Sequence, residues 1–142
     1  MRTFGDRIRH ALSFEIIGLI LVMPLGAWVF DMPMFDIGIV GLVSSLLATM
    51  WTYVYNLLFD HAMLRITDHV QKTLKIRVFH AILYEVGLLM VLVPFIAWYL
   101  NVTWLYAFLM DVSFAAFYMT YAFAFNWAYD AVFPVPLTRV PK

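Results

Sequence analysis

The chain has 142 residues, of which 65% are hydrophobic, and its mean hydropathy is +0.88. Soluble domains are about half apolar, so this composition excludes an ordinary soluble protein and predicts an integral membrane protein. The formal net charge is zero and the sequence contains no cysteine, which excludes a disulfide framework and a thiolate-bound metal or cluster.

Four apolar stretches are long enough to cross about 30 Å of hydrocarbon at about 1.5 Å per residue. In chain order they cover residues 11–30, 37–59, 81–100 and 104–133. The first stretch starts with polar residues and no small-residue cleavage site follows it, so we expect it to be retained rather than removed as a signal peptide. The sequence therefore predicts an all-α membrane protein with four transmembrane helices.

Positive charge is confined to one side of these spans. The Lys and Arg residues lie before the first span, between the second and third, or after the fourth: Arg2, Arg7, Arg9, Arg65, Lys72, Lys75, Arg77, Arg139 and Lys142. The two opposite connections, residues 31–36 and 101–103, carry none. Because positive residues favour cytoplasmic loops, we expect both termini and the central loop in the cytoplasm.

The sequence also repeats itself at an offset of 70 residues. Residues 7–15 (RIRHALSFE) are matched by 77–85 (RVFHAILYE), and residues 51–60 (WTYVYNLLFD) are matched by 121–130 (YAFAFNWAYD). Each copy contains two spans, so both copies enter the membrane from the same side as parallel repeats. We expect two helical hairpins as the two domains, residues 1–70 and 71–142.

Each repeat sets a glutamate near the cytoplasmic start of its first span, Glu15 and Glu85. Apolar surroundings disfavour the charged carboxylate, so such a group can take up and release a proton in a transport cycle. Ionisable residues inside membrane spans are costly and mark functional sites. The alternative is a protonated glutamic acid that only hydrogen-bonds a neighbouring helix.

Charged residues at the cytoplasmic ends of the spans suggest two ion pairs. We predict that Arg7 pairs with Asp60 and that Arg77 pairs with Asp130, which would neutralise these charges near the interface. The alternative is that each arginine extends to lipid headgroups. An asparagine, Asn56 or Asn126, precedes each aspartate by four residues, so it shares the helix face and can bridge to a neighbouring helix.

The repeated histidines, His10 and His80, allow another interpretation, because two imidazoles at similar depth could be axial ligands of a haem. However, each histidine recurs together with a glutamate, whose negative charge haem ligation does not need. A metal site that joins His10 to Glu15 is also disfavoured, because residues five apart point to different helix faces. We expect no cofactor and no metal.

Aromatic residues occur at helical spacing in the second helix, including Trp51 and Tyr55. Such a stripe beside a buried carboxylate can hold a lipophilic cation through ring faces and charge. The alternative is an ordinary aromatic belt at the membrane interface. Tyr84 adjoins Glu85, and its hydroxyl could contact that carboxyl.

Asp111 is an acidic residue outside the repeat, because Gly41 occupies the matching position. It lies about two turns inside the outer end of the fourth span. There it could attract cations near an exit or face a polar crevice.

These motifs resemble those of the proteobacterial antimicrobial compound efflux (PACE) transporters, which are built from two bacterial transmembrane pair domains. The family pattern RxxHaxxFE is matched at residues 7–15 and again at 77–85, where Tyr84 replaces the second phenylalanine. The pattern WNxxxNxxFD is matched at residues 51–60, with Thr52 where the family often has asparagine. Residues 121–130 match it more loosely, with Tyr129 in place of phenylalanine.

The resemblance implies a proton-coupled exporter of cationic biocides such as chlorhexidine or dyes, and of short-chain diamines, in the bacterial inner membrane. We expect a homodimer, because four helices can hardly enclose a drug-sized path, and we expect neither enzyme activity nor a nucleic-acid partner. Alternatives are a structural or haem-bearing membrane anchor, and a channel, which the lack of a continuous polar helix face disfavours. The predicted proton-coupling or substrate-binding residues are Glu15, Glu85, His10, His80, Asn56, Asn126, Trp51, Tyr55, Tyr84 and Asp111.

Overall fold

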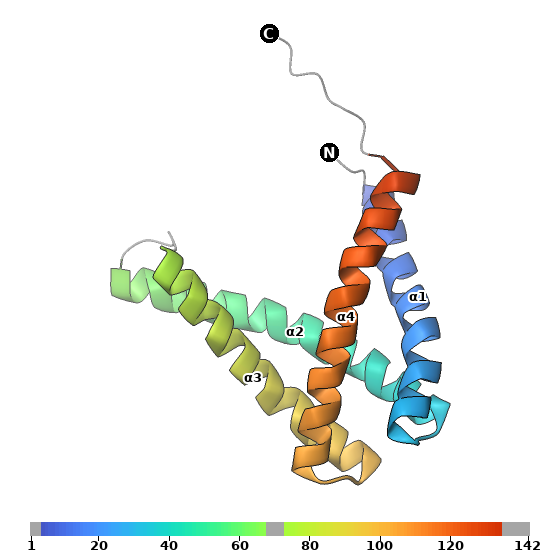
Figure 1. The fold of residues 1–142 in the computed structure, drawn as a ribbon. Helices are drawn as coiled ribbons and strands as arrows, with labels where there is room; N and C mark the ends of the chain where they lie inside the picture. Colours follow the sequence, from blue (N-terminus) through green and yellow to red (C-terminus); the bar gives the residue numbers. More distant parts are fainter. Residues whose placement is uncertain (1–3, 68–72, 135–142) are drawn as a thin grey trace. The chain divides into compact units, whose positions relative to one another are not determined.

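A computed structural model describes residues 4–67 and 73–134 of the chain (Figure 1). These residues form four helices: α1 (Phe4–Phe30), α2 (Met34–Thr67), α3 (Leu74–Leu100) and α4 (Trp104–Val132). All four are long and apolar enough to cross a membrane, and the described residues contain no strand. The prediction of an all-α, four-span membrane protein is confirmed.

Three helices, α1, α2 and α3, extend beyond their predicted apolar spans, in each case at the end that carries the Lys and Arg residues. α1 begins at Phe4 rather than at residue 11, and α2 continues to Thr67 rather than ending at residue 59. The extra turns are rich in charged residues, which form helix readily but contribute nothing to an apolar window. The apolar windows therefore underestimate the lengths of α1, α2 and α3, whereas the predicted bounds of α4 agree with the structure to within one residue.

The two turns on the opposite side repeat each other in conformation. α1 and α3 are each followed by a residue in the left-handed region, Asp31 (φ 50°) and Asn101 (φ 53°). Asp and Asn tolerate this region better than most other residues. In both turns the next backbone N–H donates to the carbonyl five residues earlier, at 3.2 and 3.1 Å. The repeat in sequence is thus also a repeat in backbone geometry.

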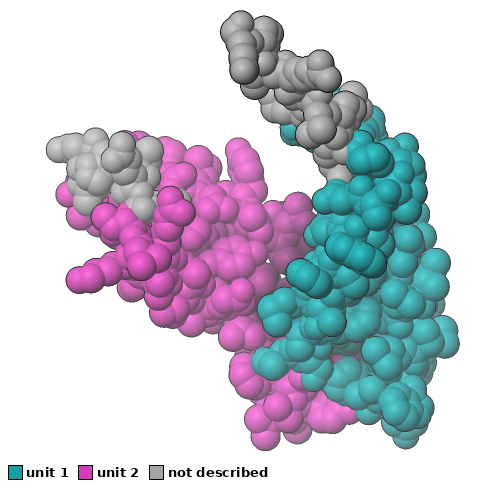
Figure 2. Space-filling model, turned by 45° about the horizontal axis from the view of Figure 1, so that its top comes forward, with its two compact units in different colours: residues 1–38, 112–142 teal, residues 39–111 magenta. Residues whose placement is uncertain are grey.

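The chain divides into two compact units that do not coincide with the two repeats (Figure 2). Unit 1 comprises residues 1–38 and 112–142, and unit 2 comprises residues 39–111. In unit 1, α1 packs with α4, and in unit 2, α2 packs with α3. Each unit therefore combines helices from different repeats. The repeat boundary between residues 70 and 71 lies outside the described residues and stays a prediction.

Glycine lets α1 and α4 approach each other closely in unit 1. A Cβ atom at Gly18 would stand 3.2 Å from Cε1 of Tyr118 and 3.1 Å from Cε1 of Tyr121. A Cβ atom at Gly26 would stand 2.8 Å from Cγ2 of Ile37, near the start of α2, so this glycine allows α1 and α2 to approach as well. Small residues at such contacts are typical of helices packed inside membranes.

Glycine has the same role in unit 2, where the indole of Trp51 lies across α3. Nε1 of Trp51 donates a hydrogen bond to the carbonyl of Tyr84 at 3.1 Å. A Cβ atom at Gly87 would overlap ring atom Cζ2 of Trp51. The absence of a side chain at this position is therefore what allows the indole to reach the Tyr84 carbonyl.

We predict that Gly87→Ala destabilises the protein. Alanine improves helix propensity by about 1 kcal/mol, but overpacking costs about 1–3 kcal/mol, and here the obstructing ring is held by a hydrogen bond. The thermal unfolding midpoint in detergent should fall. Gly5→Ala is the matched control, because nothing lies within 4 Å of its Cβ position, and its midpoint should stay or rise. A Gly87→Ala midpoint equal to wild type would contradict this account of the packing.

Candidate functional site

Two histidine–asparagine hydrogen bonds connect the repeats. Nε2 of His10 lies 2.8 Å from Oδ1 of Asn126 in unit 1, and Nε2 of His80 lies 3.1 Å from Oδ1 of Asn56 in unit 2. Because an amide oxygen only accepts, Nε2 carries the hydrogen in each pair. The structure thus brings these four predicted site residues together in two equivalent pairs, each joining the first helix of one repeat to the second helix of the other.

Aromatic rings enclose both histidines. The His10 ring lies 5.3 Å from Phe125 and 4.6 Å from Tyr129, between ring centroids. The His80 ring lies 4.9 Å from Tyr55, whose hydroxyl also donates to the backbone carbonyl of His80 at 2.7 Å. Both Nε2 atoms are engaged with asparagine, and this engagement argues against their binding a haem iron.

The backbone carbonyl that precedes each repeated glutamate accepts a hydrogen bond from an aromatic side chain of the other repeat. The hydroxyl of Tyr121 donates to the Phe14 carbonyl at 2.9 Å, and Nε1 of Trp51 donates to the Tyr84 carbonyl at 3.1 Å. The two bonds correspond at the 70-residue offset. They fix the helix backbone next to each carboxyl group.

The two glutamates differ in their surroundings. Glu15 is half-buried and its Oε1 atom is fully enclosed, whereas Glu85 is exposed on α3. Rings of α1 and α4 gather next to Glu15, where the centroid of Phe14 lies 4.8 Å from that of Tyr121 and 5.3 Å from that of Phe125. One oxygen of the Glu15 carboxyl is therefore enclosed in an aromatic part of unit 1.

The hydroxyl of Tyr84 forms a hydrogen bond with Oγ1 of Thr52 at 2.8 Å. Thr52 uses its single hydrogen to donate to the Ala48 carbonyl at 2.7 Å, so Tyr84 is the donor in their bond. The structure thus gives Thr52 a contact to α3. Sequence reasoning did not foresee this contact.

Asp111 is half-buried in α4 and interacts electrostatically with Glu85 within unit 2. The predicted ion pairs join residues of different units: Arg7 lies in unit 1 and Asp60 in unit 2, whereas Arg77 lies in unit 2 and Asp130 in unit 1. Both ion pairs stay predictions.

An unpredicted cluster joins the N-terminal end of α1 to the C-terminal end of α4. Arg9 forms an ion pair with Asp6 and donates to the hydroxyl of Tyr129 at 2.9 Å. Its guanidinium also lies 3.8 Å from the centroid of the Phe133 ring. Phe79 occupies the place of Arg9 in the second copy. Because the sequence analysis selected residues that both repeats share, it did not select Arg9.

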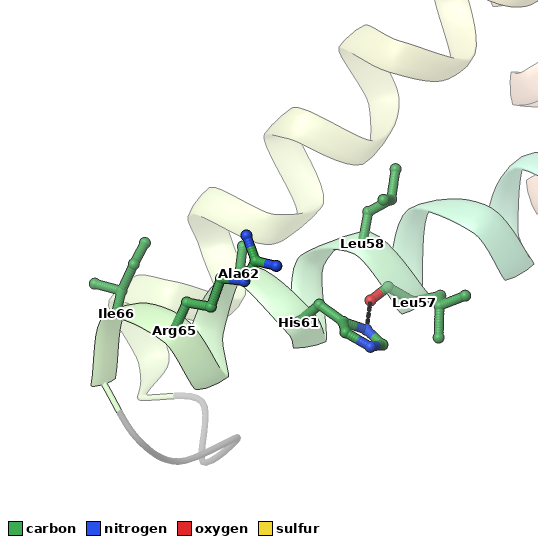
Figure 3. Close-up of a pocket in the computed structure, with 6 residues that line it drawn as sticks. All are labelled: Leu57, Leu58, His61, Ala62, Arg65 and Ile66. Atoms are coloured by element: carbon green, nitrogen blue, oxygen red, sulfur yellow. Dashed lines mark hydrogen bonds between the residues drawn. The ribbon is translucent and has the colours of Figure 1, made fainter.

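Two surface hollows lie along the C-terminal half of α2. One, of about 520 Å³, is mostly apolar but includes His61 and Arg65, and Nδ1 of His61 lies 2.7 Å from the Leu57 carbonyl (Figure 3). The other, of about 560 Å³, is lined in part by Asn56 and Asp60. Only the second hollow includes residues that the sequence selected.

Comparison with known proteins covers nearly the whole chain. The family model described as "Chlorhexidine efflux transporter" (BTP) matches twice, at residues 2–65 and 72–135. A short-chain diamines transporter of Vibrio parahaemolyticus is 36% identical over 132 residues, which cover 93% of both chains. Short-chain diamines transporters of Acinetobacter baylyi and Acinetobacter baumannii are each 31% identical, over 89% of this chain and 88% and 86% of theirs. No solved structure matches the chain.

These names describe transporters and not enzymes. The two family matches follow each other in tandem, and each contains one copy of the repeat that carries the histidine, glutamate, asparagine and aspartate motifs. The chain therefore belongs to the BTP family of chlorhexidine efflux transporters, the PACE family.

Proposed function

We propose that this transporter exports cationic compounds across the bacterial inner membrane in exchange for protons, with Glu15 as the coupling carboxylate. The observation that carries the proposal is the enclosed Oε1 atom of Glu15 among the aromatic rings of α1 and α4. The family description and the names of the relatives favour biguanide or dye biocides and short-chain diamines as substrates. Cationic charge is the property that these substrates share.

Competition for one carboxylate provides the coupling. Protonated Glu15 releases its proton to the cytoplasm when a cation binds, and a proton from outside later displaces that cation. The rings of Phe14, Tyr121 and Phe125 support this exchange, because aromatic faces attract cations and contact their apolar parts. If one proton replaces one monovalent cation, no net charge crosses the membrane and the pH gradient alone drives export.

The histidine–asparagine pairs and the aromatic–carbonyl bonds hold the helices around each glutamate. We propose that Arg7 with Asp60 and Arg77 with Asp130 form ion pairs at the cytoplasmic ends of the spans, where they neutralise charge and control opening. The distribution of Lys and Arg favours cytoplasmic termini. A homodimer supplies the additional helices that a pathway for drug-sized molecules needs.

We predict that Glu15→Gln reduces export to the background level while the protein stays folded. Glutamine keeps the shape and hydrogen bonding of a neutral carboxyl group but cannot release a proton. The measurement is substrate-dependent proton movement in proteoliposomes that contain a short-chain diamine or chlorhexidine. The unfolding free energy should stay within about 1 kcal/mol of wild type. Wild-type flux in this variant would remove Glu15 from the mechanism.

We predict that Glu85→Gln impairs export less than Glu15→Gln does. Glu85 is exposed on its helix, whereas the Glu15 carboxyl has an enclosed oxygen. Protonation of Glu15 is therefore more closely linked to helix packing. Parallel flux measurements on the two variants check this expectation. Equal losses would instead show that the two repeats act symmetrically.

We predict that cation binding weakens as the pH falls, because protons and cations compete for Glu15. Below the titration midpoint of the free carboxyl, each unit of pH should cost about tenfold in affinity. Tryptophan fluorescence titrations with a diamine at several pH values measure this dependence, and Glu15→Gln should abolish it. Constant wild-type affinity from roughly pH 3.5 to pH 8, a range that includes the ordinary glutamate titration, would contradict the competition.

A further inference from the structure

The hydroxyl of Tyr118 on α4 is buried and has no hydrogen-bond partner within residues 4–67 and 73–134. Buried tyrosine hydroxyls are normally paired, since leaving a buried polar group unpaired costs stability. An unpaired hydroxyl in a native fold therefore needs an explanation, such as a ligand that completes its hydrogen bonding.

The side chain of Tyr118 packs against the part of α1 that carries Glu15. Its Cε1 and hydroxyl oxygen stand 3.2 and 3.7 Å from the Cβ position of Gly18, and its ring centroid lies 6.3 Å from that of Phe14. Gly18 follows Glu15 by three residues, so the two share a helix face. The charge of Glu15 acts on Tyr118, and Oε1 of Glu15 is buried as well. The missing Gly18 side chain thus admits the Tyr118 ring beside the carboxyl group.

The second repeat offers no equivalent site. The residue that matches Tyr118 at the 70-residue offset is Ala48, which has no polar side-chain atom. A search for repeated residues therefore passes over Tyr118. The same difference gives the Glu15 side of the protein a hydrogen-bonding group that the Glu85 side lacks.

We propose that the Tyr118 hydroxyl oxygen accepts a hydrogen bond from an N–H group of the cation that Glu15 binds. The inference rests on the proposed export function and specifies which part of the substrate Tyr118 recognises, namely an N–H group. A protonated primary amine or a biguanide carries several N–H donors, of which one reaches the Glu15 carboxylate and another reaches Tyr118. A quaternary ammonium ion has no N–H group, so it gains nothing from the hydroxyl. Tyr118 is thereby a specificity-determining residue for hydrogen-bond-donating cations.

The test compares Tyr118→Phe with wild type in binding two dications of equal chain length. These are 1,5-diaminopentane, which has six N–H donors when doubly protonated, and its fully N-methylated bis-quaternary analogue, which has none. Tyr106→Phe is the matched control, because it removes a hydroxyl from the first turn of α4, outside the Glu15 site. Affinities are measured by tryptophan fluorescence in detergent, and circular dichroism checks that each variant stays helical.

We expect Tyr118→Phe to weaken binding of the diamine about tenfold, the usual effect of losing a hydrogen bond to a charged group, with Tyr106→Phe unchanged. Affinity for the bis-quaternary ion should not change. Unchanged diamine affinity in Tyr118→Phe, or an equal loss for both ions, would overturn the assignment. The proposed function fails separately, if Glu15→Gln binds and exports the diamine as wild type does.

Discussion

The backbone carbonyls of Phe14 and Tyr84 accept hydrogen bonds from Tyr121 and Trp51, and the packing of both units depends on these two bonds. Each bond draws a large ring against a helix next to its glutamate. The ring fits because that helix has a glycine one turn further on, at the fourth residue after Phe14 and at the third after Tyr84. The two glycines are not equivalent in the repeat, but both lie on the face that the accepting carbonyl shares. The hydrogen bond and the close ring packing that the glycine allows thus fix the helix backbone that carries each glutamate.

This arrangement explains why histidine, asparagine and glutamate recur as a block. A glutamate in an apolar helix can couple proton movement to substrate movement only if its protonation depends on whether substrate is bound. This dependence requires ordered surroundings. The histidine–asparagine bonds, at 2.8 and 3.1 Å, supply that order at the histidines that precede each glutamate by five residues. Aromatic rings fill the remaining space, as ring centroid distances between 4.5 and 6.3 Å indicate. The two histidines and Glu15 are thus packed against aromatic neighbours.

Much of the fold follows from the sequence, because burial in hydrocarbon demands apolar spans, and turn residues such as Asp31 and Asn101 mark where those spans end. The candidate site residues were selected because polar residues recur in the two repeats. The structure brings two of them together, since His10 of α1 forms a hydrogen bond with Asn126 of α4. What the sequence could not reveal is which helices pair, since a hydropathy pattern does not specify a partner. Tyr118 escaped notice for a related reason, because its matching residue is Ala48 and repetition detects only what is shared.

The crossing of the repeats has a consequence for how such a protein changes over generations. Each histidine–asparagine bond joins one duplicated half to the other, and so does each aromatic–carbonyl bond. A substitution at one of these bonded positions therefore alters a contact of the other half, and we expect compensating changes there rather than nearby in the sequence. The two copies differ at other positions, such as Tyr118 and Ala48, but these contacts link them. The two halves are selected as a matched pair, as the subunits of a dimer are, although a single gene encodes them.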